Sequence, residues 1–223
     1  WVGEDSWPSP RIRERCFILE PGYRLLPEDA ATDLRDRVNP GGKPYIAVMS
    51  PLSTGLFAGK WCSYAATPDL PHDQRQEDGG ALVFTSDPLD EDMEILGPPV
   101  LHLAYEVDRP VAMVAVRISD IDEDGRATRI TYGVRNLTHD ESHGHPRPIV
   151  PGERRCARIQ LNDVAQRFPE GHRIRVAIST SYWPLAWPAP EPVKLRVFTG
   201  DCRLVLPVRP ADPRDDELGF EAP

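Results

Sequence analysis

One acidic run has the pattern with which calcium-binding loops begin. Asp120, Asp122 and Asp124 alternate with other residues and precede Gly125, and alternate carboxylates on a tight turn supply part of the oxygen shell that Ca²⁺ requires. Thr131 occupies the position at which such a loop places a bidentate glutamate. An Asp-Gly pair also forms ordinary hairpin turns, because glycine adopts positive φ without penalty. We therefore expect a hairpin turn, and the three aspartates remain an alternative set of calcium ligands.

Three histidines in the sequence HDESHGH form the densest group of candidate metal ligands. Neutral imidazoles of His139, His143 and His145 at this spacing can hold Zn, Fe or Ni. On a β-sandwich, a His-x-His pair is similar to the cupin metal motif, which adds a glutamate and a further histidine. Here three prolines separate Glu153 from His145, and His172 directly follows a Pro-Glu-Gly turn without the gap that the second cupin motif needs. We expect a polar loop, with a metal-dependent cupin-like enzyme as an alternative.

The sequence lacks motifs that present an activated nucleophile or cradle a phosphate. It contains no G-x-S-x-G elbow, no G-x-G-x-x-G and no Walker loop. Cys16, Cys62, Cys156 and Cys202 form no CxxC or CxH pair, and they are too few for a disulfide scaffold. Cys16 and Cys156 lie in alternating apolar stretches, so we expect buried free thiols and a reducing, cytoplasmic compartment. No catalytic residue and no cofactor is expected in this chain.

Tryptophan residues beside prolines and glycines are the remaining candidates for a functional surface. Trp183 and Trp187 lie in the run YWPLAWP, which cannot continue a central strand because proline lacks the donor for the ladder. Trp61 lies in the similar context GKWC. These rings must pack on this domain, on a partner domain or on a ligand, and a sugar-binding platform is one alternative. We predict an exposed apolar patch that includes Trp183 or Trp187.

The elements that must position these residues are mostly strands. Apolar and polar residues alternate with period two from about residue 81 to 210, which is typical of antiparallel sheets with one buried face. The buried faces are predicted from the apolar positions of seven stretches, namely Leu101–Val107, Val114–Ile118, Ile130–Val134, Ala157–Leu161, Ile174–Ile178, Val193–Val197 and Leu204–Val208. The spacing of turn signals between them favours a β-sandwich.

The remaining segments are irregular, apart from a few short elements. Residues 1–80 are rich in proline and glycine, and only Cys16–Leu19 and Tyr45–Met49 have the composition of short strands. Apolar residues at helical spacing predict a two-turn helix over Leu161–Phe168. The acidic tail, residues 211–223, is expected to be a solvated end.

Composition excludes several classes of protein. The chain has 223 residues, 26 lysine and arginine residues against 35 aspartate and glutamate residues, and a net charge of −9. An acidic surface argues against nucleic acid, which requires a basic face, and against an anionic membrane surface. No apolar run approaches the length of a membrane-spanning segment, and no charged-then-apolar leader opens the sequence.

Several segments, in order, resemble the carboxy-terminal domain of the X-Pro dipeptidyl-peptidase and cocaine-esterase (CocE/NonD) family of α/β-hydrolase serine hydrolases. The similarity covers nearly the whole chain. The segments that carry it are Trp1–Pro8, Leu82–Leu89 (LVFTSDPL), Glu94–Pro98 (EILGP), Ile118–Arg126 (ISDIDEDGR), and Gly171–Arg175 (GHRIR) followed by Ile178-Ser179.

The resemblance implies a jelly-roll β-sandwich of the galactose-binding-like type, comprising residues 81–210. Residues 1–80 would leave an upstream catalytic domain and wrap the sandwich. The family's Ser, Asp and His triad would lie in that upstream α/β-hydrolase domain of the same polypeptide, so His172 is not assigned to a triad. The chain would cover that domain and help to shape its substrate cleft. A stand-alone carbohydrate-binding module is the alternative, and a homo-oligomer is a further expectation.

Overall fold

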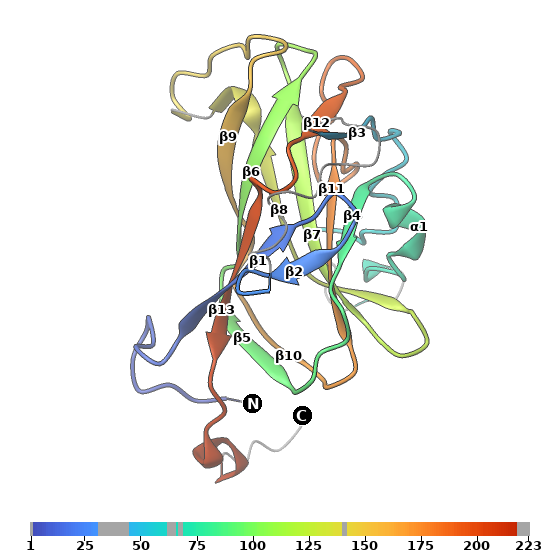
Figure 1. Ribbon diagram of the computed structural model, residues 1–223. Helices are drawn as coiled ribbons and strands as arrows, with labels where there is room; N and C mark the ends of the chain where they lie inside the picture. The colour runs from blue at the N-terminus through green and yellow to red at the C-terminus, as the bar shows by residue number, and fades with distance from the viewer. Residues whose placement is uncertain (1, 31–44, 62–65, 67–68, 140–141, 218–223) are drawn as a thin grey trace.

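Two packed antiparallel sheets make up the structure, a computed structural model that describes residues 2–30, 45–61, 66, 69–139 and 142–217 (Figure 1). In the described residues strands predominate and the helices are few and short, so the expectation of an all-β sandwich is confirmed. None of the helices in the described ranges is long and apolar enough to cross a lipid bilayer.

The larger sheet has nine strands, and its main path runs in the order β10-β5-β13-β6-β12-β3. Off this path, β1 pairs with β13 and β2, and β9 pairs with β6. The strands are β1 (Arg13–Leu19), β2 (Leu25–Pro27), β3 (Ile46–Val48), β5 (Met93–Gly97), β6 (Val100–Val107), β9 (Arg155–Gln160), β10 (Val164–Phe168), β12 (Leu195–Val197) and β13 (Arg203–Arg209).

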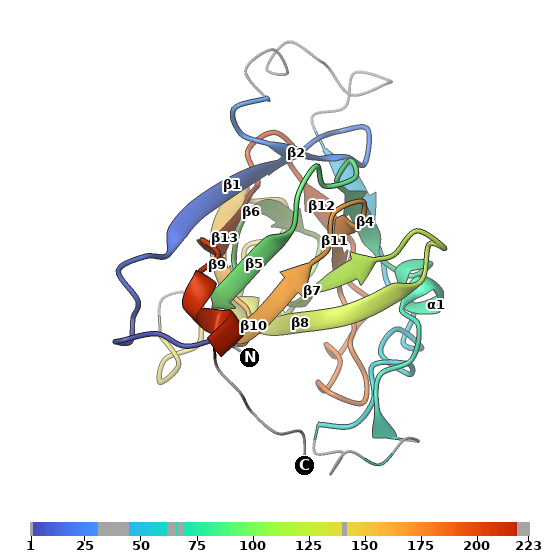
Figure 2. The ribbon, with the colours of Figure 1, turned by 90° about the horizontal axis from the view of Figure 1, so that it is seen from below.

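The smaller sheet has four strands in the order β4-β11-β7-β8. Its strands are β4 (Leu82–Thr85), β11 (Arg173–Ser179), β7 (Met113–Ile121) and β8 (Ala127–Asn136). The short helix α1 (Arg75–Asp78) lies beside β4 on the outer side of this sheet, away from the larger one (Figures 1 and 2).

The main core lies between the two sheets and follows the predicted alternation. Leu101, Leu103 and Tyr105 of β6 are fully buried, as are Val114 and Val116 of β7. Because successive side chains of a strand point to opposite faces, these residues also fix which side chains face outward. The predicted buried faces of β6 and β7 are therefore confirmed.

The buried face predicted for Ile130–Val134 is wrong, because Thr131 and Gly133 lie opposite the core residues Ile118 and Val116 of β7. Thr131 is accordingly 4% exposed, whereas Val134 is 41% exposed.

The helix predicted over Leu161–Phe168 is wrong. This segment contains strand β10, which pairs with β5 in antiparallel register from Val164 opposite Gly97 to Phe168 opposite Met93. A helix of two turns is marginal on its own, whereas the ladder with β5 satisfies the same backbone groups. The apolar positions fit both periods in so short a window, so the neighbouring strand decides the outcome.

The described parts of residues 1–80 contribute strands to the sandwich. Strand β1 pairs with β13 from Arg13 opposite Val208 to Ile18 opposite Arg203, and β3 pairs with β12. The predicted strands at Cys16–Leu19 and Tyr45–Met49 are thus confirmed as β1 and β3, with β1 beginning three residues earlier. Helix α1 was not predicted.

Candidate functional site

The outer face of the smaller sheet carries a second, smaller apolar layer. Its buried members are Met113 and Ala115 of β7, with Ala58 and Tyr182 from two loops. Met113, Ala115 and Arg117 alternate with the core residues of β7, so they point away from the main core. This face of the sheet is therefore covered by the loops that contain residues 50–61 and 180–187.

Backbone contacts hold these two loops together. Ser50 and Thr180 exchange hydrogen bonds, with the N–H of each donating to the hydroxyl oxygen of the other at 3.0 and 2.9 Å. The N–H of Trp183 donates to the carbonyl oxygen of Thr54 at 3.1 Å. Gly55 has φ +115°, and a Cβ there would lie 2.2 Å from the carbonyl oxygen of Trp183. Only glycine permits so close an approach at this φ.

Tyr182 anchors the second loop to the sheet. Its side chain is fully buried, and its hydroxyl accepts a hydrogen bond from Nη1 of Arg129 on β8 at 2.8 Å. Its ring lies below the guanidinium of Arg117, with 5.7 Å between Cζ and the ring centroid. Burial raises the pKa of Tyr182 above its usual value of 10, so the hydroxyl remains protonated at neutral pH.

The first loop is anchored through a buried ion network. Arg117 and Glu77 have side chains that are each 1% exposed, with 3.8 Å between Nη1 and Oε2. Arg117 also pairs with Asp78 at 3.2 Å, and Arg175 of β11 reaches the same carboxylate at 3.0 Å. Two guanidinium groups thus face two carboxylates, and this pairing offsets the cost of burying the charges.

Above these anchors lie the exposed aromatic rings. Trp183 is 37% exposed and Trp187 is 81% exposed, and their rings meet edge to face with centroids 5.0 Å apart. Leu52 and Leu56 of the neighbouring loop are also exposed. We call these four residues the aromatic platform. The exposure predicted for Trp183 and Trp187 is therefore confirmed.

Trp61 lies further along the first loop and is 84% exposed. In the described parts of the chain it makes no ring contact with Trp183 or Trp187. The next residue, Cys62, lies outside the described residues. The structure thus brings together two of the three predicted tryptophans.

The sequence predicted two candidate metal sites, the acidic run and the histidine loop, and the structure places them in different surroundings. The acidic run forms the predicted hairpin turn between β7 and β8, where Asp122 accepts the N–H of Arg126 at 2.8 Å and Gly125 has φ +78°. Oδ1 of Asp120, on β7, lies 2.9 Å from Nδ1 of His172, the residue before β11. His172 thus lies beside the end of β7, directly before an inner strand of the smaller sheet.

Of the three histidines, His139 is half-buried, and His143 and His145 are exposed. Nδ1 of His139 lies 3.2 Å from Nδ1 of His143, while His145 is exposed further along the loop. Asp140 and Glu141 between them lie outside the described residues. In the described ranges, no group of three His, Cys, Asp or Glu side chains has a metal-binding arrangement.

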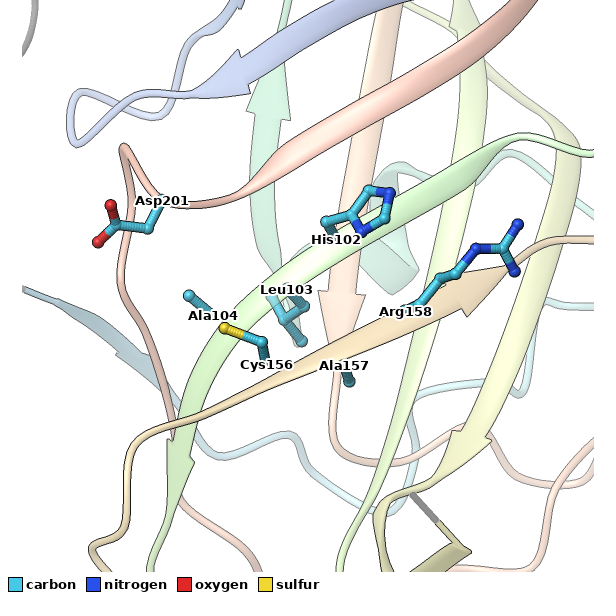
Figure 3. Close-up of a pocket in the computed structure, with 7 residues that line it drawn as sticks. All are labelled: His102, Leu103, Ala104, Cys156, Ala157, Arg158 and Asp201. Carbon is cyan, nitrogen blue, oxygen red and sulfur yellow. The ribbon is translucent and has the colours of Figure 1, made fainter. Parts of the chain in front are cut away.

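A shallow pocket of about 220 Å³ lies on the outer face of the larger sheet (Figure 3). His102, Cys156, Arg158 and Asp201 contribute its polar side chains. The Asp201 carboxylate points away from both the thiol and the imidazole, and it pairs with Arg154. The imidazole of His102 also points away from the thiol of Cys156 in Figure 3, so these side chains do not form a nucleophile and base pair of the kind that hydrolysis requires.

The prediction that Cys156 is buried is wrong. Cys156 is exposed and Cys16 is half-buried, whereas Cys202 is fully buried, and all three are free thiols. The alternation places Ala157 inward and therefore Cys156 outward. Burial raises the pKa of Cys202 to about 12, which keeps it as an unreactive thiol.

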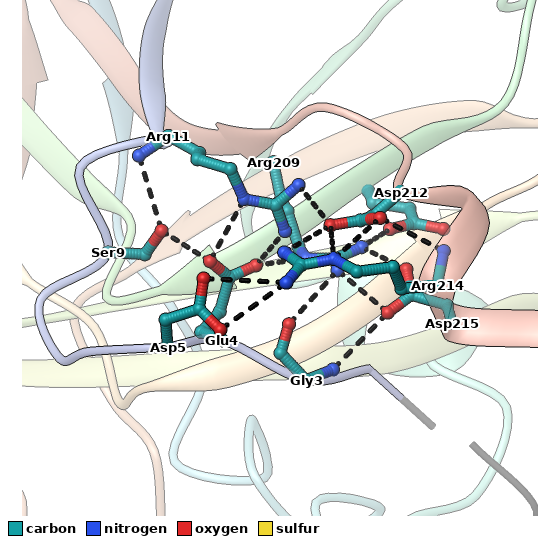
Figure 4. A network of polar contacts seen from close by, with 10 residues as sticks. Gly3, Glu4, Asp5, Ser9, Arg11, Arg209, Asp212, Arg214 and Asp215 are labelled. Atoms are coloured by element: carbon teal, nitrogen blue, oxygen red, sulfur yellow. Dashed lines mark hydrogen bonds and ion pairs between the residues drawn. The ribbon is translucent and has the colours of Figure 1, made fainter. Parts of the chain in front are cut away.

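Part of the acidic tail is held against the domain: Asp212 and Asp215 are half-buried, whereas Ala211, Pro213 and Arg214 are exposed. Arg209, at the end of β13, has a side chain that is 1% exposed and pairs with Asp215, Glu4 and Glu94 at 2.6 to 2.8 Å (Figure 4). Asp212 pairs with Arg214 at 2.8 Å. We call this network the terminal clasp, because it ties residues 3–11 to the end of β13.

The clasp makes stability depend on pH. Hydrogen bonds from Arg11, Ser9 and Arg209 lower the pKa of Glu4 from its usual 4.5 to about 2, against the opposing effect of burial. A lowered pKa gives stability that is complete above pH 4.5 and is lost as the pH falls toward 2. We expect the urea midpoint to fall over this range and to fall less in E4Q. Equal pH slopes in the two proteins would contradict this assignment.

Taken together, these features define an all-β sandwich domain with a fixed aromatic surface on one outer face. Residues 1–211 match the family model described as the X-Pro dipeptidyl-peptidase C-terminal non-catalytic domain. The chain belongs to this family, which confirms the resemblance seen in the sequence motifs.

Known proteins show the same relationship. The chain is 27% identical over 198 residues to a Mycobacterium bovis protein described as a serine esterase, covering 80% of this chain and 30% of that protein. It is 22% identical over 186 residues to the cocaine esterase of a Rhodococcus species, covering 82% and 32%. The chain thus spans about a third of the length of these relatives.

A solved structure shares the fold. The aminopeptidase of a marine sediment Thaumarchaeota archaeon superposes with a TM-score of 0.73 at 20% identity, over 94% of this chain and 39% of that chain.

The sequence did not identify the anchors of the platform. Glu77 lies in the segment expected to be irregular, and Arg117 lies on a strand face expected to be polar. The strand alternation placed Arg117 on the correct face. It could not show that two loops bury that face, because these contacts join residues more than 35 positions apart.

Proposed function

We propose that this chain is the accessory β domain of a serine hydrolase of the X-Pro dipeptidyl-peptidase or acyl-esterase type. In this proposal the aromatic platform packs on the α/β-hydrolase domain of the same polypeptide, with Trp61 at its margin, and helps to shape the substrate cleft. Clefts often form at domain interfaces, and the exclusion of water there strengthens the stabilisation of a developing oxyanion.

One observation carries the proposal. Trp183 and Trp187 are held by anchored loops and nevertheless remain exposed in this chain. Exposed aromatic side chains on a rigid support are typical of the centre of a protein interface, where tryptophan contributes much of the binding energy. The relatives are about three times longer than this chain, which leaves room for such a partner domain.

The experiment compares hydrogen exchange in this chain and in the full-length polypeptide. We expect the amides of residues 52–56, 183 and 185–187 to exchange at least about tenfold more slowly in the full-length protein, because docking excludes water from them. In full-length W183A/W187A this protection is expected to disappear, whereas W7A, which changes an exposed tryptophan outside the platform, is expected to retain it. Equal exchange in both wild-type proteins would overturn the docking proposal.

A carbohydrate-binding module is the second candidate, because the Trp187 ring is exposed enough to stack on a sugar. Binding on a glycan array that W187A abolishes would favour this function. If the platform instead binds a second copy of this chain, the molecular mass in solution should increase with protein concentration.

The cytoplasmic location that we propose is supported by the free thiols of Cys16, Cys156 and Cys202.

A further inference from the structure

Glu77 joins the buried ion network to the loop that supports the tryptophans. We propose that Glu77 is the positioning residue of the aromatic platform: its carboxylate fixes the backbone of residues 55–57 and, through it, the place of Trp183. The role of this device in docking rests on the proposed function above. The fixing of the loop concerns this chain alone and can be tested separately.

Hydrogen bonds to Glu77 hold the loop of residues 55–57 in place. The carboxylate of Glu77 accepts the N–H of Gly55 through Oε2 and the N–H of Phe57 through Oε1, both at 2.5 Å. Within the described residues, neither N–H donates to a backbone carbonyl. Two N–H groups of a tight loop thus depend on one side chain, and leaving them unpaired in a buried position is costly.

The positive charge of Arg117 keeps the Glu77 carboxylate in place. Its side chain is 1% exposed, so the carboxylate needs hydrogen bonds and a nearby cation. Arg117 lies 3.8 Å from Oε2 and is itself oriented by Gln74 Oε1 at 3.3 Å and by Asp78. Helix α1 is only four residues long, so these contacts, rather than the helix, determine where the carboxylate lies.

Backbone contacts connect the loop of Thr54 and Gly55 to Trp183. Thr54 accepts the N–H of Trp183, and Gly55 lies so close that a Cβ there would overlap the backbone of Trp183. A shift of residue 55 must therefore be followed by a shift of Trp183 or by a gap between the loops. Because close-packed backbone contacts transmit small displacements, Glu77 determines the position of the Trp183 ring without contacting it.

Hydrogen exchange in this chain tests the device. In the wild type, the amides of Gly55 and Phe57 are expected to exchange as slowly as amides of the smaller sheet. In E77Q, which lacks the charge and one acceptor, both amides are expected to exchange about tenfold faster or more, as for the loss of a hydrogen bond to a charged group. Residues 183 and 185–187 are expected to exchange faster in parallel.

The control is E14Q, which makes the same change on an exposed position of β1 and is expected to leave all of these rates unchanged. The sheet amides of β7 and β11 distinguish positioning from general destabilisation, because a purely structural role would accelerate them as well. Rapid exchange of Gly55 and Phe57 in the wild type would overturn the proposal without any variant, as would unchanged loop exchange in E77Q.

The full-length polypeptide separates this proposal from the proposed function. There, E77Q is expected to lose the protection of the platform that docking confers. If the wild-type full-length protein shows no such protection, the docking function fails, while the comparison of wild type and E77Q in this chain still decides whether Glu77 positions the loop.

Discussion

Replacing Arg209 with alanine is expected to lower the free energy of unfolding by about 3 kcal/mol or more. The side chain of Arg209 is 1% exposed, and the substitution leaves Glu4, Glu94 and Asp215 facing one another without their shared cation. Removing one member of a buried ion network is costly because the remaining charges stay desolvated. For a domain of this size, the melting temperature should fall by about 10 °C, measured by circular dichroism at pH 7.

Two variants make this result specific. R203A removes an exposed pair with Glu28 and is expected to cost less than about 1 kcal/mol. R209K keeps the charge but not the planar fork that binds Asp215 through two nitrogens, so it should lie between the wild type and R209A. Equal losses in R203A and R209A would show that the terminal clasp does not stabilise the domain.

The second large effect is expected from G55A. Alanine at φ +115° is strained, and its Cβ would lie 2.2 Å from the carbonyl oxygen of Trp183 and 2.6 Å from its nitrogen. Because these neighbours are backbone atoms, the two loops must separate. We expect the N–H of Trp183 to exchange at least about tenfold faster, because separation of the loops breaks its hydrogen bond to Thr54.

G125A provides the matched control. Gly125 also has positive φ, at +78°, but a Cβ there would meet no atom within 4 Å. Its cost is therefore the backbone strain alone, about 1 kcal/mol, and the exchange of Trp183 should not change. If G55A and G125A behave alike, the close contact between the loops is not what holds the platform together.

Local patterns predicted most of the strands correctly and failed where two structures compete for one segment. The alternation along β6 and β7 determines the inward face because burial of one side of a sheet is required whichever strands become neighbours. Leu161–Phe168 satisfied both a helical and a strand pattern, and only pairing with β5 decided between them. The expectation that Cys156 is buried is wrong because it rests on the apolar neighbours of Cys156, whereas alternation with the buried Ala157 places Cys156 outward.

In the candidate site, too, local sequence predicted some features and tertiary contacts decided the others. The sequence indicated that Trp183 and Trp187 cannot continue a central strand, and this followed from proline alone. The ion pairs of Arg209 were not predicted, because Glu4 and Asp215 lie 205 and 6 positions away in the sequence, on opposite sides of it. No local pattern indicates which carboxylates such a side chain will meet.

The sequence by itself determined the all-β class, the buried faces of β6 and β7, the hairpin at Gly125 and the family, because each depends on residues that are close together or on their order. The tertiary structure alone decided that Glu77 and Arg117 become a buried pair and that the loop of Gly55 lies against that of Trp183. These contacts depend on chain segments that meet only when the two sheets have packed, and their energies come from the exclusion of water at that meeting point.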